Sequence, residues 1–191
     1  KRLEDRLDLL QRLDQAITDV AAEPPAMLLV RSACTRVWVA GADLKEISGL
    51  DDESLDAYLA DGQQIFARMA ALPCPVIALI DGATLGGGLE LAMRCHGMVV
   101  SQTSQRGKSY PIGLPEAGLG LVPGWGGTQL LPARVSPSTS IPAIATGATF
   151  QSDAMPSGLA DTVVDSPDEL DAAARSLASN LDPTTLPHTV C

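Results

Sequence analysis

Five consecutive apolar residues, Val76–Ile80, place the strongest limit on the fold of this chain. An apolar run without polar alternation is typical of a strand that is covered on both faces. A glycine-rich turn follows it directly and leads into residues 90–93, which we expect to be helical. A buried strand joined by a short turn to a helix predicts an α/β architecture with layered sheets and helices.

The rest of the chain alternates in the same way. Apolar residues spaced by three and four predict amphipathic helices over residues 3–21 and 55–69, each closed by prolines. Short apolar runs predict strands at 27–31, 37–40, 98–101 and 160–165. We expect further helices from residue 126 or 128, over 141–148 and over 168–179, and a polar loop at 102–110.

Composition narrows the possible partners. Thirteen basic against 23 acidic residues give a net charge of −10, and without a basic stripe we expect no nucleic-acid partner. The apolar stretches are too short for a membrane span, and the four cysteines show no metal-ligand spacing. The two histidines, His96 and His188, have no spaced partner, so we expect no metal site. Reduced thiols favour a cytoplasmic protein.

Two segments, 39–44 and 82–90, share a strand, a turn of small residues and the start of a helix. The first amides of a helix have no partner within it and lie at the positive end of its dipole. Two such amides that converge on one oxygen form an oxyanion hole. The alternative is a pair of tight turns without a ligand.

Two glycine-rich segments fail as phosphate-binding motifs. Gly107-Lys108-Ser109 ends like a P-loop, but Gln102 stands where that motif requires its first glycine. Residues 124–129 begin like a dinucleotide fingerprint, but Gln129 replaces its last glycine. Neither segment predicts a nucleotide site.

Three blocks of sequence resemble the signature blocks of the enoyl-CoA hydratase/isomerase (crotonase) family. They are VAGADLKEI at 39–47, PCPVIALIDGATLGGGLELAM at 73–93 and IGLPEAGLGLVPGWGGTQLL at 112–131. The resemblance implies a crotonase-like α/β spiral of ββα units with a helical C-terminal part. It also implies a core at 1–165 without its first strands and a partial helical region at 166–191, so that the domain is truncated at both ends. The hydratase part of the multifunctional fatty-acid oxidation α-subunit looks most similar.

The resemblance also implies roles for individual residues. The amides of Ala42 and Gly87 would bind the thioester oxygen, and Glu90 and Glu116 would be the catalytic carboxylates. The residues implied to contact substrate are Ala40, Asp43, Leu44, Gly86, Pro115, Gly124 and Trp125. From the residues alone, we expect Asp43 to cap a helix rather than to act in chemistry, and Trp125 fits a core aromatic as well as a wall of the acyl pocket.

The implied activity is hydration of 2-enoyl-CoA thioesters in fatty-acid β-oxidation. Coenzyme A is then part of the substrate, and we expect no separate cofactor. A δ-isomerase that uses Glu116 and a non-catalytic acyl-CoA-binding or assembly module are the alternatives. Family members commonly form oligomers, so we expect a homo-oligomer or part of a multienzyme complex. Residues 102–110 are longer than the family's usual connection, and Arg106 and Lys108 there either reach a phosphate or face solvent.

Overall fold

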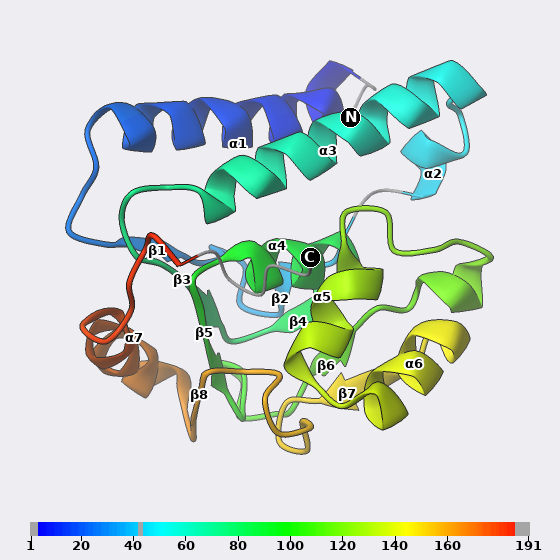
Figure 1. The fold of residues 1–191 in the computed structure, drawn as a ribbon. Helices are drawn as coiled ribbons and strands as arrows, with labels where there is room; N and C mark the ends of the chain where they lie inside the picture. The colour runs from blue at the N-terminus through cyan, green and yellow to red at the C-terminus, as the bar shows by residue number, and fades with distance from the viewer. Residues whose placement is uncertain (1–3, 42–43, 186–191) are drawn as a thin grey trace.

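Two four-stranded sheets lie at the centre of the computed structural model, which describes residues 4–41 and 44–185 (Figure 1). The strands are β1 (Leu28–Val30), β2 (Val37–Val39), β3 (Val76–Ile80), β4 (Ala83–Leu85), β5 (Gly97–Ser101), β6 (Pro111–Gly113), β7 (Thr149–Gln151) and β8 (Thr162–Val164). The helices are α1 (Glu4–Ala22), α2 (Leu44–Ile47), α3 (Asp52–Ala70), α4 (Gly87–Arg94), α5 (Gly127–Arg134), α6 (Pro137–Thr146) and α7 (Leu170–Ala178). Short 3₁₀ helices, η1 (Glu116–Leu119) and η2 (Pro167–Glu169), complete the set.

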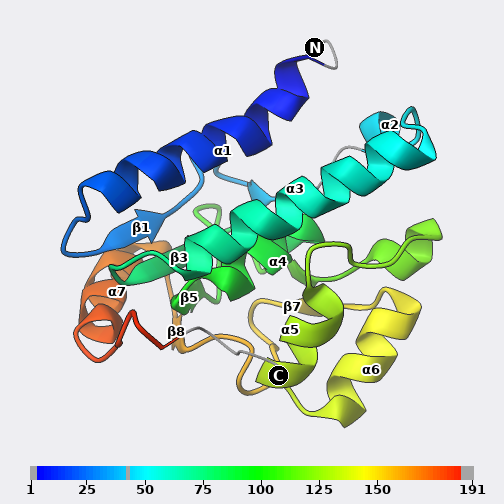
Figure 2. The same cartoon turned by 45° about the horizontal axis from the view of Figure 1, so that its top comes forward.

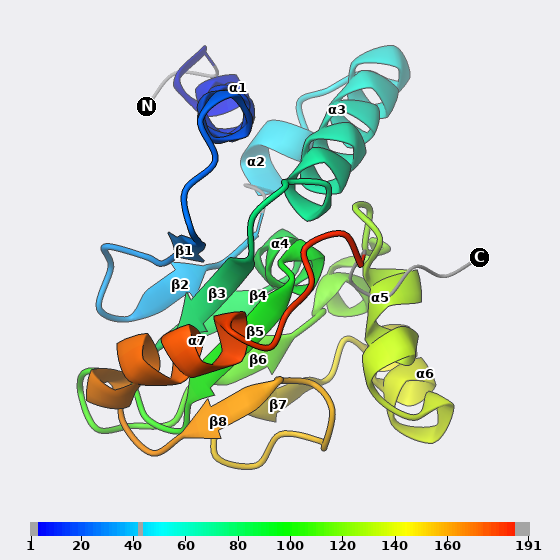
Figure 3. The same ribbon diagram turned by 60° about the vertical axis from the view of Figure 1, so that its left-hand side comes forward.

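The first sheet has the order β1-β3-β5-β8, and all of its strands are parallel. Its central strands are buried on both faces because side chains alternate between them. Ile77 and Leu79 pack under α7 with Leu170, whereas Ala78 and Ile80 face the main core. Figure 3 shows α7 lying across this sheet.

The second sheet has the order β2-β4-β6-β7 and positions the site. Strands β2, β4 and β6 are parallel, and β7 is antiparallel to β6. Parallel strands end at the same edge of a sheet, so the residues that follow Val39, Leu85 and Gly113 meet there. A hydrogen bond from the Gly86 amide to the Gly113 carbonyl, 2.9 Å long, joins two of these ends.

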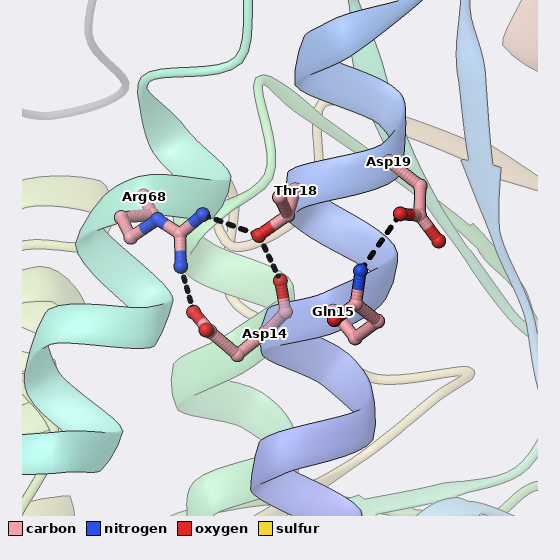
Figure 4. A network of polar contacts seen from close by, with 5 residues as sticks. All are labelled: Asp14, Gln15, Thr18, Asp19 and Arg68. Atoms are coloured by element: carbon pink, nitrogen blue, oxygen red, sulfur yellow. Dashed lines mark hydrogen bonds and ion pairs between the residues drawn. The ribbon is translucent and has the colours of Figure 1, made fainter.

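Helices α1 and α3 lie side by side (Figure 2), and α3 packs on α4. Helix α1 contributes Ile17, which is 2% exposed, to the core. Figure 4 shows how the two helices are joined: Arg68 of α3 pairs with Asp14 and donates to the Thr18 hydroxyl, which in turn donates to the Asp14 carbonyl. These polar contacts fix the register of α1 on α3.

The elements predicted from strong apolar patterns are confirmed, and those without such patterns were missed. The strand at Val76–Ile80 and the helices at Glu4–Ala22 and Asp52–Ala70 form as expected. Strands β4, β6 and β7 have three residues each and lie in turn-rich sequence, where too few residues alternate to be recognised. The helix expected at 141–148 is wrong in its bounds. It begins at Pro137 and ends at Thr146, because Gly147 adopts a left-handed φ of 71°.

Residues 102–110 form a compact loop at the end of β5. The Ser104 amide donates to the Lys108 carbonyl, and the buried Tyr110 hydroxyl donates to the carbonyls of Ser101 and Ile80. Arg106 and Lys108 are exposed on this loop. In the described part of the chain, no helix is both long and apolar enough to cross a membrane.

Candidate active site

A cavity of about 470 Å³ opens at the edge where β2, β4 and β6 end. Its walls are mainly apolar, and among the described residues the charged side chains that line it are two glutamates. The lining residues are Ala40, Gly41, Leu44, Ile47, Leu55, Tyr58, Leu59, Gly86, Gly87, Glu90, Pro115, Glu116, Leu119, Leu121, Val122, Pro123, Gly124 and Trp125. An apolar cavity with a few convergent polar groups is the usual form of a small-molecule site.

The turn between β4 and α4 presents bare backbone to this cavity. Gly86 precedes the helix with a φ of 54°, a conformation that favours glycine, and no side chain caps the helix. The Gly87 amide therefore lies at the positive end of α4 without a partner inside the helix. A Cβ on Gly41 would lie 3.2 Å from the Gly87 nitrogen, so the first strand end approaches this amide closely.

Ala42 and Asp43 lie outside the described residues. Their predicted roles, an oxyanion amide and a substrate contact, therefore stay predictions. The other substrate contacts predicted from the family resemblance all line the one cavity; they are Ala40, Leu44, Gly86, Pro115, Gly124 and Trp125. Because these six residues come from three sequence blocks, the fold brings together segments that are far apart in the chain.

Glu90 stands in the first turn of α4 and is 2% exposed. Its Oε1 accepts hydrogen bonds from the amides of Trp125 and Gly127, each 2.8 Å long. Burial raises the pKa of Glu90, while these two amides and the Arg94 charge act in the opposite direction. The carboxylate is thus fixed through one oxygen.

Glu116 begins η1 and reaches across the Gly86 turn. Its Oε1 lies 2.9 Å from the point that a Cβ on Gly86 would occupy, so a side chain there would displace the carboxylate. Its Oε2 is buried and has no hydrogen-bond partner within residues 4–41 and 44–185. Burial first, and then the nearby charge of Glu90, raises the pKa of Glu116 to about 7. Near neutral pH this group is therefore both a proton donor and a proton acceptor.

Trp125 both lines the cavity and packs in the core, so the two interpretations of this residue are compatible. Its indole is 7% exposed and lies 5.4 Å from the ring of Tyr58 and 5.0 Å from that of Phe66, between ring centroids. A Cβ on Gly62 of α3 would meet the indole at 2.2 Å, and one on Gly87 of α4 at 2.5 Å. The indole thus fills the space between α3 and α4 beside the Gly87 amide.

Sequence reasoning missed several residues of the site. Gly127 supplies a donor to Glu90, yet its sequence context marked it only as the start of a helix. Leu55, Tyr58 and Leu59 line the cavity from α3, whose apolar stripe indicated only core packing. The loop 102–110 contributes no residue to the cavity wall, so Arg106 and Lys108 lie away from it. Among the described residues, no three histidine, cysteine or acidic side chains cluster as a metal site would require.

The chain is similar to known proteins in both sequence and fold. The family model described as "Enoyl-CoA hydratase/isomerase" matches residues 6–188. The chain belongs to this family. The predicted crotonase-like α/β fold, with two small sheets, is confirmed by that match and by the solved structures below.

Solved members of the family superimpose on most of this chain. An enoyl-CoA hydratase from Geobacillus kaustophilus is 28% identical with a TM-score of 0.81, over 94% of this chain and 65% of that one. One from Bacillus anthracis is 29% identical with a TM-score of 0.76, over 91% and 65%. A human mitochondrial delta3-delta2-enoyl-CoA isomerase, 22% identical with a TM-score of 0.76 over 90% and 65%, shares the fold.

This crotonase-family chain thus spans about 65% of the length of the solved structures described above. The finer resemblance to a multifunctional α-subunit stays a prediction, as does the division of the chain at residue 165.

Proposed function

We propose that this protein is an enoyl-CoA hydratase, which adds water across the 2,3 double bond of 2-enoyl-CoA thioesters in fatty-acid β-oxidation. The observation that carries the proposal is that two carboxylates, Glu90 and Glu116, line one apolar cavity beside the uncapped Gly87 amide. Hydration needs a base for water, an acid for carbon and a donor for the developing oxyanion. The cavity brings a candidate for each to one place.

The Gly87 amide would bind the thioester carbonyl oxygen, with the Ala42 amide as its predicted partner. As the double bond is attacked, negative charge moves onto this oxygen, and donors at a helix N-terminus hold that charge better than the neutral carbonyl. Each donor of this kind contributes on the order of 3 kcal/mol to the transition state.

Glu90 is assigned as the base that takes a proton from water. Two amides donate to its Oε1 and so fix the plane of the carboxylate. The direction of Oε2, the oxygen that would take the proton, is then fixed as well. The hydroxide oxygen bonds to C3 and the π electrons of the double bond move toward the thioester. A base that is already held in one orientation removes the entropic cost of aligning a base with water and substrate.

Glu116 is assigned as the acid that delivers a proton to C2. A carboxyl with a pKa of about 7 is substantially protonated at neutral pH, as a general acid must be. After turnover Glu90 holds the water proton and Glu116 has lost its own, so solvent exchange restores both groups. The net reaction adds one water molecule and consumes nothing else.

The partner in this proposal is an acyl-CoA whose hydrocarbon chain contacts the apolar walls, and coenzyme A belongs to the substrate. We propose that no separate cofactor takes part. Assembly as a homo-oligomer or in a multienzyme complex, and a cytoplasmic location, stay predictions from the sequence.

An isomerase activity is the second candidate, favoured by Glu116. A single carboxyl that is half ionised near neutral pH can remove a proton from C2 of a 3-enoyl thioester and return it at C4. This reaction needs no activated water, so Glu90 is dispensable for it.

The experiment measures loss of the enoyl-thioester absorbance with crotonyl-CoA and a longer 2-enoyl-CoA, and isomerisation of a 3-enoyl-CoA, for the parent and Glu90→Gln. We expect hydration by the parent, and a larger loss of hydration than of isomerisation in the variant. A folded parent that isomerises but does not hydrate would make the isomerase the function. Binding of acyl-CoA without either reaction would identify a non-catalytic module.

A further inference from the structure

Arg94 lies one helical turn beyond Glu90 in α4, on the same face of the helix. Its Nη2 atom is 2.9 Å from the point that a Cβ on Gly126 would occupy. Gly126 has a φ of 114°, which also disfavours a side chain. The guanidinium therefore packs against the bare backbone of Gly126.

The Gly126 turn is the structure that holds Glu90. The residues on either side of it, Trp125 and Gly127, donate their amides to Glu90 Oε1. Arg94 thus contacts the residue between the two donors. A shift of the guanidinium would move the turn, and with it both hydrogen bonds to the carboxylate.

The charge of Arg94 is only partly solvated. The side chain is partly buried, and its Nε is buried without a hydrogen-bond partner among the described residues. Charges that have lost water interact more strongly with their neighbours than charges at an exposed surface do. Within the described part of the chain, the charged group that acts on Glu90 is Arg94 in its own helix, while Glu116 of η1 is the neighbouring carboxyl on which the charge of Glu90 acts.

The surroundings of Glu90 act on it in opposite directions. Burial favours the protonated form, whereas the two amides that donate to its Oε1 and the charge of Arg94 favour the ionised carboxylate. A general base must be ionised before it can accept a proton. Arg94 is the side chain that shifts this balance toward the base.

We propose that Arg94 is a positioning residue, which orders the Gly126 turn and keeps Glu90 ionised so that Glu90 can activate water. The inference rests on the proposed hydratase function. It assigns Arg94 no contact with substrate, because this residue is not part of the cavity wall.

The test compares the pH profile of kcat/KM for crotonyl-CoA in the parent, R94M and R94K. We expect the acid limb of R94M to move measurably to higher pH while the alkaline limb, which the acid Glu116 sets, stays in place, and we expect R94K to stay near the parent. Arg31→Met, which removes an exposed arginine that pairs with Asp171, is the matched control and leaves the limb in place.

A uniform loss of activity in R94M at every pH, with the limb unmoved, would mean that Arg94 has a structural role only and would overturn the proposal. R94Q replaces R94M if the latter does not fold. A limb that moves equally in R94K and R94M would also contradict it, because lysine retains the charge.

A second measurement does not depend on turnover. The unfolding free energy of E90Q is compared with that of the parent at several pH values, with and without R94M. Without the Arg94 charge, an ionised Glu90 lowers the unfolding free energy further. We therefore expect E90Q to raise the unfolding free energy near neutral pH by more in the R94M background than in the parent background. An equal gain in both backgrounds would refute the role of Arg94. Because this readout needs no substrate, failure of the hydratase proposal would be recognised separately.

Discussion

Replacing Glu116 by glutamine is expected to stabilise the protein at pH 8 while it damages the site. The side chain is partly buried, with its Oε2 buried and without a partner among the described residues, and its pKa is raised from 4.5 to about 7. The native state therefore binds this proton more tightly than the unfolded chain does. Stability from the protonated group is complete below pH 4.5 and is lost as the pH rises through 7.

The pKa shift of Glu116 sets the size of this change in stability. At 1.36 kcal/mol per pKa unit, an ionised Glu116 costs the native state at most about 3 kcal/mol at pH 8 and below about 1 kcal/mol at pH 5, and solvent reduces both figures because the side chain is only partly buried. Glutamine keeps the shape of the side chain without its charge. We therefore expect the unfolding free energy of E116Q to exceed that of the parent by about 1–3 kcal/mol at pH 8, or roughly 2–12 °C in Tm for a chain of this size.

Denaturant unfolding at pH 5 and pH 8 measures this difference directly. Glu23→Gln is the matched control, because it removes the same charge from an exposed position at the end of α1 and we expect it to change stability little at either pH. If the advantage of E116Q over the parent is the same at pH 5 and pH 8, the reasoning about the buried carboxyl is wrong.

Two further substitutions test the packing beside the cavity and the hydrogen bonds of the loop at 102–110. Gly62→Ala places a methyl group 2.2 Å from the Trp125 Nε1 position, and overpacking of this kind should cost about 1–3 kcal/mol in chemical denaturation, whereas Gly118→Ala, with no atom within 4 Å of its new Cβ, should be nearly neutral. Tyr110→Phe leaves two buried carbonyls without the hydroxyl that donates to them, and we expect a loss of about 1–3 kcal/mol; a Tm equal to that of the parent would contradict this.

Much of the fold could be predicted because its main elements carry strong local patterns. Val76–Ile80 is unbroken, apolar and preceded by prolines, and the strand forms at those bounds. The helix at Asp52–Ala70 likewise follows its apolar stripe. Strand β4 is different: its three residues gain their hydrogen bonds from β2 and β6, which are distant in sequence. Local pattern says nothing about such partners.

The residues of the site also divide into those that the sequence predicted and those that only the structure explains. Glu90, Glu116 and Gly87 were predicted as site residues through motif resemblance, and the structure places all three on one cavity. Gly62 carried no signal, because a glycine inside a helix is explained only when the Trp125 indole is seen to fill its side-chain space. Arg94 resembled an ordinary basic residue at the end of a helix until its contact with Gly126 was visible.

The central claim is that Glu90 and Glu116 perform chemistry on an acyl thioester that the cavity binds. The most direct test measures kcat for hydration of crotonyl-CoA and, in parallel, Kd for a saturated acyl-CoA, in the parent, E90Q and E116Q. General acid–base catalysis contributes about 10²–10⁴-fold, so each substitution should lower kcat by at least about a hundredfold while Kd changes little. An unchanged kcat in either variant, or a loss of kcat that follows a loss of binding, would contradict the account.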